Sequence, residues 1–168
     1  VTAVDVGYGQ LAWRLRNDPR VKVVDRKNFR IVDPRSIGAP FDFVTVDVSF
    51  ISLTKIAEKL RASVSDGAHV IALVKPQFEA GRAAVGRGGV VRDAASHVGA
   101  VESVAQAFAA VGLTPLRLTH SPIKGPAGNI EFLLGCDIAE LRSANDITEV
   151  VAALDAAGVV AAAHEALD

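Results

Sequence analysis

The stretch FDFVTVDVSFISL, residues 41–53, decides the fold class. It begins with an apolar and β-branched run that is typical of a buried strand, and Ser52 can cap a helix after it. A second apolar strand, AHVIALV at residues 68–74, stops at Lys75 and Pro76, because proline cannot continue a sheet ladder. Strands that alternate with helices in this way predict an α/β domain with a largely parallel sheet.

The rest of the chain continues this alternation. Further strands are predicted at residues 1–6, 21–24, 116–119 and 130–136, and helices at residues 10–17, 52–64, 94–111 and from Asp146 onward. The last two strands are joined by SPIKGPAGN, which is too short for a crossover helix, so we expect them to pair antiparallel. No repeat or linker divides the 168 residues, which are enough for one domain.

Three charged residues stand at the ends of apolar strands. Asp47 and Lys75 each end one, and Glu131 opens another. Open α/β sheets place their chemistry at one edge, so we predict that the three side chains converge there as an active site. Each residue also has a purely structural alternative, since a strand-end Asp can cap a turn, a Lys can extend off an apolar strand, and an edge Glu can be solvated.

The order Asp, Lys, Glu on successive strands resembles the FtsJ-like ribose 2′-O-methyltransferases, and within them the TlyA family, known both as ribosomal RNA methyltransferases and as hemolysins. The resemblance covers Val1 to about Asp137. The stretches that carry it are VDVGYGQLAWRLR, FDFVTVDVSFISL, IALVKPQFEAG, GGVVRD and SPIKGPAGNIEF.

The resemblance implies a Rossmann-like S-adenosylmethionine-dependent methyltransferase sheet with strand order 3-2-1-4-5-7-6 and a terminal antiparallel hairpin. It also implies a Lys-Asp-Lys-Glu tetrad whose first Lys, like the glycine-rich cofactor loop, lies upstream of Val1. Residues 1–168 are therefore expected to form an amino-terminally truncated methyltransferase domain that lacks its first, central strand. Alone, such a chain is expected to bind S-adenosylmethionine weakly and to be inactive.

The resemblance also assigns catalytic roles. An alcohol must lose its proton as the methyl group arrives, so the site needs a base and strict positioning. We assign the base to Lys75, which requires burial or a nearby cation, since a lysine amine is ordinarily protonated at neutral pH. Asp47 is expected to orient Lys75 and to complement the sulfonium charge, and Glu131 to hold the amine or the target ribose.

S-adenosylmethionine is the cofactor that the resemblance implies. Asp5 is expected to accept hydrogen bonds from the two ribose hydroxyls, and Asp25 or Asn28 to reach the adenine amino group. Asn28 has the equal alternative of shaping a turn. The complete cofactor-binding set is Asp5, Gly7, Tyr8, Asp25, Asn28 and Asp47.

Two other functions compete with this interpretation. Residues 7–12, GYGQLA, satisfy the G-x-G-x-x-G/A fingerprint of NAD-binding domains, and Asp25 follows at a suitable distance. Against a dehydrogenase, Asp5 stands where the fingerprint strand is normally apolar, and Asp47, Lys75 and Glu131 receive no common role. A third hypothesis is a catalytically idle fragment that binds RNA or a partner protein.

Composition bears on partners and location. The net charge is −1, but residues 1–92 carry 15 Lys and Arg against 9 Asp and Glu, whereas residues 93–168 carry 3 against 10. The basic part can face phosphates, which fits ribosomal RNA or a ribosomal subunit as the partner. The single Cys136 excludes an internal disulfide and fits the cytoplasm.

Metal and membrane binding are not expected. The four histidines are scattered, with no His or Cys pair at ligand spacing. No apolar run approaches the length of a membrane span, so the hemolysin function receives little support from the sequence.

Overall fold

The computed structural model describes residues 1–139, 141 and 143–167. Its strands are β1 (Thr2–Val4), β2 (Lys22–Val24), β3 (Phe41–Val46), β4 (Val64–Val74), β5 (Leu113–His120) and β6 (Phe132–Ile138). Its α-helices are α1 (Trp13–Arg16), α2 (Pro34–Ile37), α3 (Ala57–Arg61), α4 (Pro76–Glu79), α5 (Ala94–Ala109), α6 (Ala144–Ala152) and α7 (Ala156–Leu167). Three 3₁₀ turns are η1 (Leu53–Lys55), η2 (Arg82–Ala84) and η3 (Arg87–Gly89).

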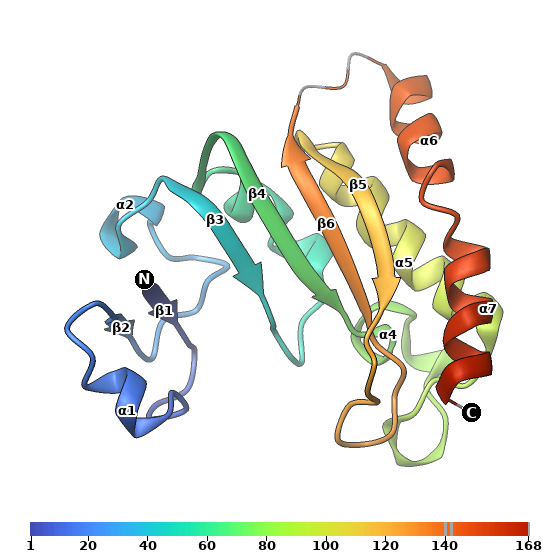
Figure 1. Ribbon diagram of the computed structural model, residues 1–168, viewed down its shortest axis with the longest axis horizontal. Helices are drawn as coiled ribbons and strands as arrows, with labels where there is room; N and C mark the ends of the chain where they lie inside the picture. Colours follow the sequence, from blue (N-terminus) through green and yellow to red (C-terminus); the bar gives the residue numbers. More distant parts are fainter. Residues whose placement is uncertain (140, 142, 168) are drawn as a thin grey trace.

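The main sheet has the strand order β3-β4-β6-β5 (Figure 1). β3 and β4 are parallel, whereas β6 runs antiparallel to both β4 and β5. The predicted antiparallel pairing of the last two strands is therefore confirmed, and so is the α/β alternation that ends in it. β4 is longer than predicted because it begins at Val64, directly after α3.

β1 and β2 form a separate two-stranded parallel sheet. Between β1 and β3 lies a groove of about 550 Å³, lined by Val4, Phe43, Val46 and Leu60 among others. Phe43 is 57% exposed there, although it lies on a strand rich in apolar residues. The main sheet and the small sheet are thus separate, with no strand pairing between them.

Helix α5 packs against one face of the main sheet, and α7 packs beside it (Figure 1). Val101, Val104 and Phe108 on α5 have no exposed surface, nor do Phe132 and Leu134 on β6. Burial of such large apolar side chains is the main favourable contribution to the folding of this layer pair. This core holds the end of β4 and the start of β6, which carry Lys75 and Glu131, in fixed positions.

Two predicted helix starts can be compared with the structure. Ser52 accepts a hydrogen bond from Thr54 N–H, as expected of a cap, but the helix after it is a short 3₁₀ turn followed by α3. Asp146 was expected to cap the last helix, and this is wrong. Ser143 is the cap, and its hydroxyl oxygen accepts a hydrogen bond from Asp146 N–H. The Asp146 carboxylate, at the third helical position, accepts one from Ser143 N–H, which completes a capping box.

The last helical region is two helices, because the chain turns at Asp155, whose φ is 49°. By length and composition alone, Ala144–Leu167 qualifies as a candidate membrane span, which differs from the expectation that no such stretch exists. Alanine and β-branched residues give the stretch its high mean hydropathy, although it also contains charged residues such as Asp146, Glu149 and Asp155. Val151, Leu154, Val160 and Ala163 within it are buried against the rest of the protein.

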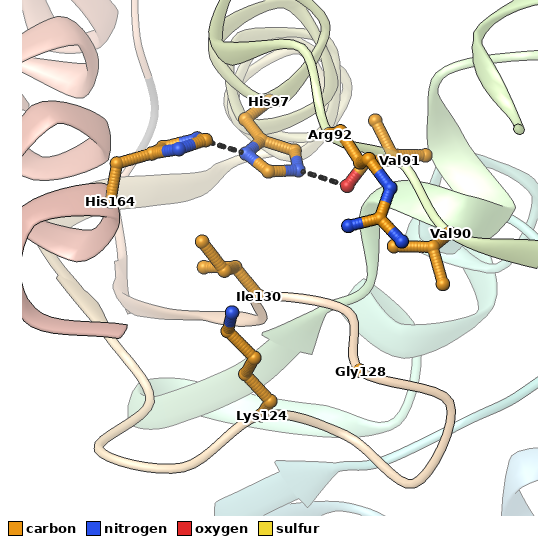
Figure 2. A pocket seen from close by; sticks show the side chains of 8 residues that line it. All are labelled: Val90, Val91, Arg92, His97, Lys124, Gly128, Ile130 and His164. Atoms are coloured by element: carbon orange, nitrogen blue, oxygen red, sulfur yellow. Dashed lines mark hydrogen bonds between the residues drawn. The ribbon is translucent and has the colours of Figure 1, made fainter. Parts of the chain in front are cut away.

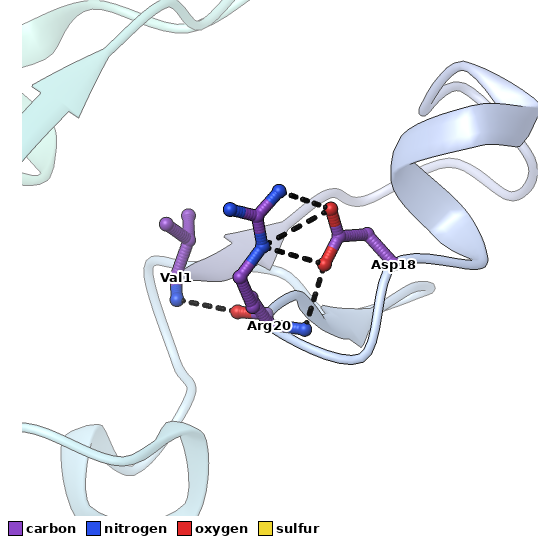
Figure 3. Close-up of polar contacts among 3 residues, drawn as sticks. All are labelled: Val1, Asp18 and Arg20. Carbon is purple, nitrogen blue, oxygen red and sulfur yellow. Dashed lines mark hydrogen bonds and ion pairs between the residues drawn. The ribbon is translucent and has the colours of Figure 1, made fainter.

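Besides the pairing of β1 with β2, the small sheet has exposed polar contacts at its margin. The Val1 amine donates a hydrogen bond of 2.8 Å to the Arg20 carbonyl, and Arg20 forms an ion pair of 2.7 Å with Asp18 in the turn before β2 (Figure 3). Exposed ion pairs of this kind contribute little to stability. The small sheet therefore depends on neighbouring apolar surface for its position.

Cys136 is buried on β6, and burial raises the pKa of its thiol to about 12. Because the thiolate is the reactive form, we expect iodoacetamide at pH 8 to modify folded protein far more slowly than protein in urea. Mass spectrometry of timed samples measures both rates. The unfolded chain loses the proton near pH 9, so between pH 9 and 12 this thiol makes stability fall as pH rises. Equal alkylation rates in the two states would contradict the burial.

Candidate active site

Three strand ends meet at one edge of the main sheet. Asp47 follows β3 and Lys75 follows β4, both at carboxyl ends, and Glu131 immediately precedes β6. β6 is antiparallel to β4, and Val74 is opposite Phe132 in the register. The next residue on β4 and the preceding residue on β6, Lys75 and Glu131, therefore lie at the same edge of the sheet.

Lys75 binds two partners on the loop after β3. Its Nζ lies 2.5 Å from a carboxylate oxygen of Asp47 and donates a hydrogen bond of 3.0 Å to Ser49 Oγ. The Lys75 side chain is 12% exposed and that of Asp47 71%. The amine is thus largely enclosed by its neighbours, while the carboxylate is largely open to solvent.

Glu131 is the most buried member of the cluster, with 8% of the residue exposed. Burial raises the pKa of its carboxyl group above the ordinary value. The Lys75 charge lowers that pKa, the Asp47 charge raises it, and hydrogen bonding by Gln77 lowers it. The Glu131 carboxyl group therefore interacts electrostatically with both Lys75 and Asp47.

Gly125, in the loop between β5 and β6, leaves room for Glu131. A Cβ atom at this position would lie 2.6 Å from Glu131 Oε1, which is closer than real contacts allow. The loop is closed by hydrogen bonds from Gly125 N–H to the Asn129 carbonyl and from Gly128 N–H to the Gly125 carbonyl. Sequence reasoning missed Gly125, and its place in GPAGN before Glu131 was the available signal.

We expect Gly125→Ala to displace the Glu131 carboxylate, because the side chain can move more easily than the loop backbone. Catalytic groups moved by about 1 Å can lose about 10²-fold in rate, so we expect turnover to fall by roughly 10- to 100-fold. Turnover of the full-length protein and thermal unfolding of the same preparations measure the effect. Gly128→Ala is the control in the same loop, because a Cβ atom there meets no other group. It is an imperfect control, because the φ of 93° at this position strains any residue other than glycine. An unchanged turnover in Gly125→Ala would show that the position of Glu131 does not matter.

Phe50 is a further residue of this edge that sequence reasoning missed. It is 93% exposed and has a φ of 64°, a conformation that bulky residues rarely adopt. Its ring centroid lies 5.3 Å from that of Phe78, on the segment that follows Lys75. An exposed aromatic ring in a strained backbone conformation next to a charged cluster indicates a contact surface. The signal in the sequence was an apolar ring between two serines in VSFIS.

The predicted cofactor residues other than Asp47 lie after β1 and β2. Asp5 follows β1, and one of its carboxylate oxygens accepts a hydrogen bond of 2.6 Å from Gly7 N–H. A carboxylate has further lone pairs, so this contact leaves capacity for a ribose diol. Asp47 lines the same groove as Thr2 and Val4 of β1.

Asp25, Asn28 and Tyr8 have intramolecular partners. Arg16 lies 2.5 Å from Asp25, and this hydrogen bond holds the pKa of the Asp25 carboxyl below its ordinary value. Asn28 Oδ1 accepts a hydrogen bond from Arg30 N–H, which is the turn-shaping role. The Tyr8 ring is contacted by the guanidinium groups of Arg16 and Arg26. One side-chain oxygen of Asp25 and that of Asn28 are thus engaged within the protein, and each side chain keeps further hydrogen-bonding capacity.

A second hollow, of about 200 Å³, lies beside the 124–130 loop (Figure 2). His97 and His164 are hydrogen-bonded there at 3.0 Å, and the other ring nitrogen of His97 bonds the Val91 carbonyl. These histidines are 67 residues apart, so sequence spacing could not reveal the pair. Among the residues that the structure describes, no group of three or more His, Cys, Asp or Glu is arranged to hold a metal ion.

Comparisons with known proteins agree with this geometry. The chain is 44% identical over 167 residues to the 16S/23S rRNA (cytidine-2′-O)-methyltransferase TlyA of Mycobacterium tuberculosis, across 99% of the chain and 59% of that relative. It is 52% identical over 134 residues to YqxC of Bacillus subtilis, a candidate rRNA methyltransferase, across 79% of the chain and 47% of the relative.

Among solved structures, a candidate hemolysin from Streptococcus thermophilus is similar with a TM-score of 0.86 at 40% identity, over 99% of this chain and 58% of that one. The chain thus spans less than two thirds of the length of these relatives. A model of the FtsJ-like methyltransferase family matches residues 1–138, which is most of the chain. The resemblance read from the motifs is therefore confirmed, and the chain belongs to the FtsJ-like methyltransferase family.

Proposed function

We propose that the full-length protein transfers a methyl group from S-adenosylmethionine to the ribose 2′-hydroxyl of cytidine in 16S and 23S ribosomal RNA. The observation that carries the proposal is the Lys75–Asp47 ion pair beside the buried Glu131, at the carboxyl edge of parallel strands. The relative in Mycobacterium tuberculosis is named for this activity. A ribosomal RNA substrate also implies a cytoplasmic location.

The roles of the three residues follow from their positions. Bound S-adenosylmethionine supplies an electrophilic methyl group and a thioether leaving group. We assign Lys75 Nζ as the acceptor of the hydroxyl proton as the oxygen attacks, which requires the amine to have given up its own extra proton, and Asp47 and Ser49 fix the direction of that amine. The exposed Asp47 carboxylate complements a sulfonium charge. Glu131, with its raised pKa, hydrogen-bonds the ribose or the amine from the buried side.

RNA binding is supported by charge and by one aromatic ring. Arg82, Arg87 and Arg92 are exposed on the glycine-rich segment after α4, and cations at such positions bind phosphates. The exposed Phe50 ring can stack on an unpaired base, which is a common means of RNA recognition. Asp47, Lys75, the Phe50 ring and the arginines all belong to segments that follow the carboxyl ends of β3 and β4.

We further propose that residues 1–168 are a methyltransferase domain whose sheet receives one more strand in the groove between β1 and β3. Both strands are unpaired on their facing sides, and the groove between them is apolar. An inserted strand satisfies two rows of backbone groups and covers Phe43. Amide exchange compares the chain with the full-length protein. We expect slower exchange in β1 and β3 of the latter, and equal rates would contradict an inserted strand.

The function is tested by incubating full-length protein with ribosomal subunits and radiolabelled S-adenosylmethionine, then mapping 2′-O-methylated positions by primer extension. Label in cytidine ribose is the expected result. Label in a base, or none, would contradict the proposal. Calorimetric titration of S-adenosylmethionine and NAD into the same protein distinguishes the methyltransferase from the dehydrogenase hypothesis, because a dehydrogenase would bind only NAD. The predicted fingerprint helix at residues 10–17 is a single turn, α1, that begins four residues after Gly9.

A further inference from the structure

Glu79, the last residue of α4, binds the loop that carries Asp47 and Ser49. Its Oε1 accepts a hydrogen bond of 2.8 Å from Leu53 N–H, and its Oε2 accepts one of 2.6 Å from the Ser52 hydroxyl. Both groups lie at the start of η1, where backbone N–H groups have no partner within the turn. The carboxylate therefore joins α4 to the loop after β3, since Glu79 lies 27 residues after Ser52 and 26 residues after Leu53.

This bridge is one of three contacts between the same two segments. Residues 47–53 follow β3, and residues 75–79 follow β4. Lys75 binds Asp47 and Ser49 at one end, the Phe50 and Phe78 rings meet in the middle, and Glu79 binds the other end. The contacts run in the same order along both segments, so they hold the loop as a unit against the segment after β4.

Partial burial and hydrogen bonds hold the Glu79 carboxylate in one position. The carboxyl group is partly buried, which raises its pKa, while the hydrogen bonds from Ser52 and Leu53 lower it. Ser52 Oγ donates to Glu79 Oε2, accepts Thr54 N–H at 3.1 Å and lies 2.7 Å from the Thr54 hydroxyl, so several contacts fix its position. A buried carboxylate that loses its donors is costly, and the pairing therefore resists movement of the loop.

We propose that Glu79 is a positioning residue for methyl transfer, which holds the 47–53 loop so that Asp47, Ser49 and Phe50 keep their places around Lys75. The inference rests on the proposed function and extends it to a residue outside the predicted catalytic set. Glu79 acts through the loop and does not touch the reacting atoms. Its loss should therefore change how often the site is correctly arranged, more than how tightly the cofactor binds.

The test compares Glu79→Ala and Glu79→Gln in the full-length protein, with Glu58→Ala as a matched control, since Glu58 is an exposed glutamate on α3. Gln keeps an acceptor for Leu53 N–H and an amide that can donate to Ser52 Oγ. We expect Glu79→Ala to lower kcat by roughly 10- to 100-fold with KM for S-adenosylmethionine within about 2-fold. Glu79→Gln should recover most of kcat, and Glu58→Ala should match wild type.

A second readout does not depend on activity. NMR hydrogen exchange should show faster exchange of the Leu53 amide and a shifted Lys75 ¹⁵Nζ signal in Glu79→Ala, with both restored in Glu79→Gln. If wild-type protein does not methylate RNA, the proposed function fails, and these NMR signals still decide whether Glu79 positions the loop. Unchanged signals in Glu79→Ala would overturn the inference. So would a loss of kcat that follows a loss of thermal stability and is not recovered by Gln.

Discussion

Replacing Lys75 by alanine in the full-length protein is expected to lower the turnover number for RNA methylation by roughly 10²-fold or more, because a positioned base is lost. The affinity for S-adenosylmethionine should change little, since Lys75 is held by Asp47 and Ser49 and is not in the set assigned to the cofactor. Single-turnover methylation and calorimetry measure the two effects separately. Lys55→Ala, at an exposed lysine on η1, is the matched control.

Lys75→Arg distinguishes a base from a simple cation. Arginine can keep the ion pair with Asp47, but its guanidinium is effectively always protonated and cannot accept the hydroxyl proton. If Lys75 is the base, the Arg variant should be about as inactive as the Ala variant. Near-normal turnover of either variant would move the base to another group, and Glu131 would be the next candidate because of its raised pKa.

The second large effect is on stability. Phe108, on α5, is completely buried among residues of the main core. Phe108→Ala removes most of that side chain and leaves a cavity, so we expect the free energy of unfolding to fall by about 3–5 kcal/mol. Urea denaturation followed by circular dichroism measures the change. Phe43→Ala, at the exposed ring in the groove, should cost under about 1 kcal/mol in the 168-residue chain. A small loss for Phe108→Ala would mean that α5 does not anchor the sheet.

The edge that gathers the three charged residues could be predicted from local patterns, because charges interrupt the apolar runs at strand ends. Asp47, Lys75 and Glu131 can each be recognised as a charged residue beside an apolar strand. The parallel pairing of β3 and β4 brings the ends of these two strands to one edge. The motifs around these residues also predicted the family, which the comparisons confirm. Helix ends were less accurate, since Ser143 and Asp146 are both ordinary capping residues and only the backbone geometry distinguishes their roles.

The sequence by itself determined the α/β alternation, the antiparallel last pair and the identity of the three charged residues, because each depends on residues close together in the chain. Only the tertiary structure decided which distant groups meet. Glu79 meets Leu53 across 26 residues, and His97 meets His164 across 67. The room that Gly125 leaves for Glu131 also depends on the loop path. Such contacts follow from how packed elements place side chains in space, and local propensity carries no information about them.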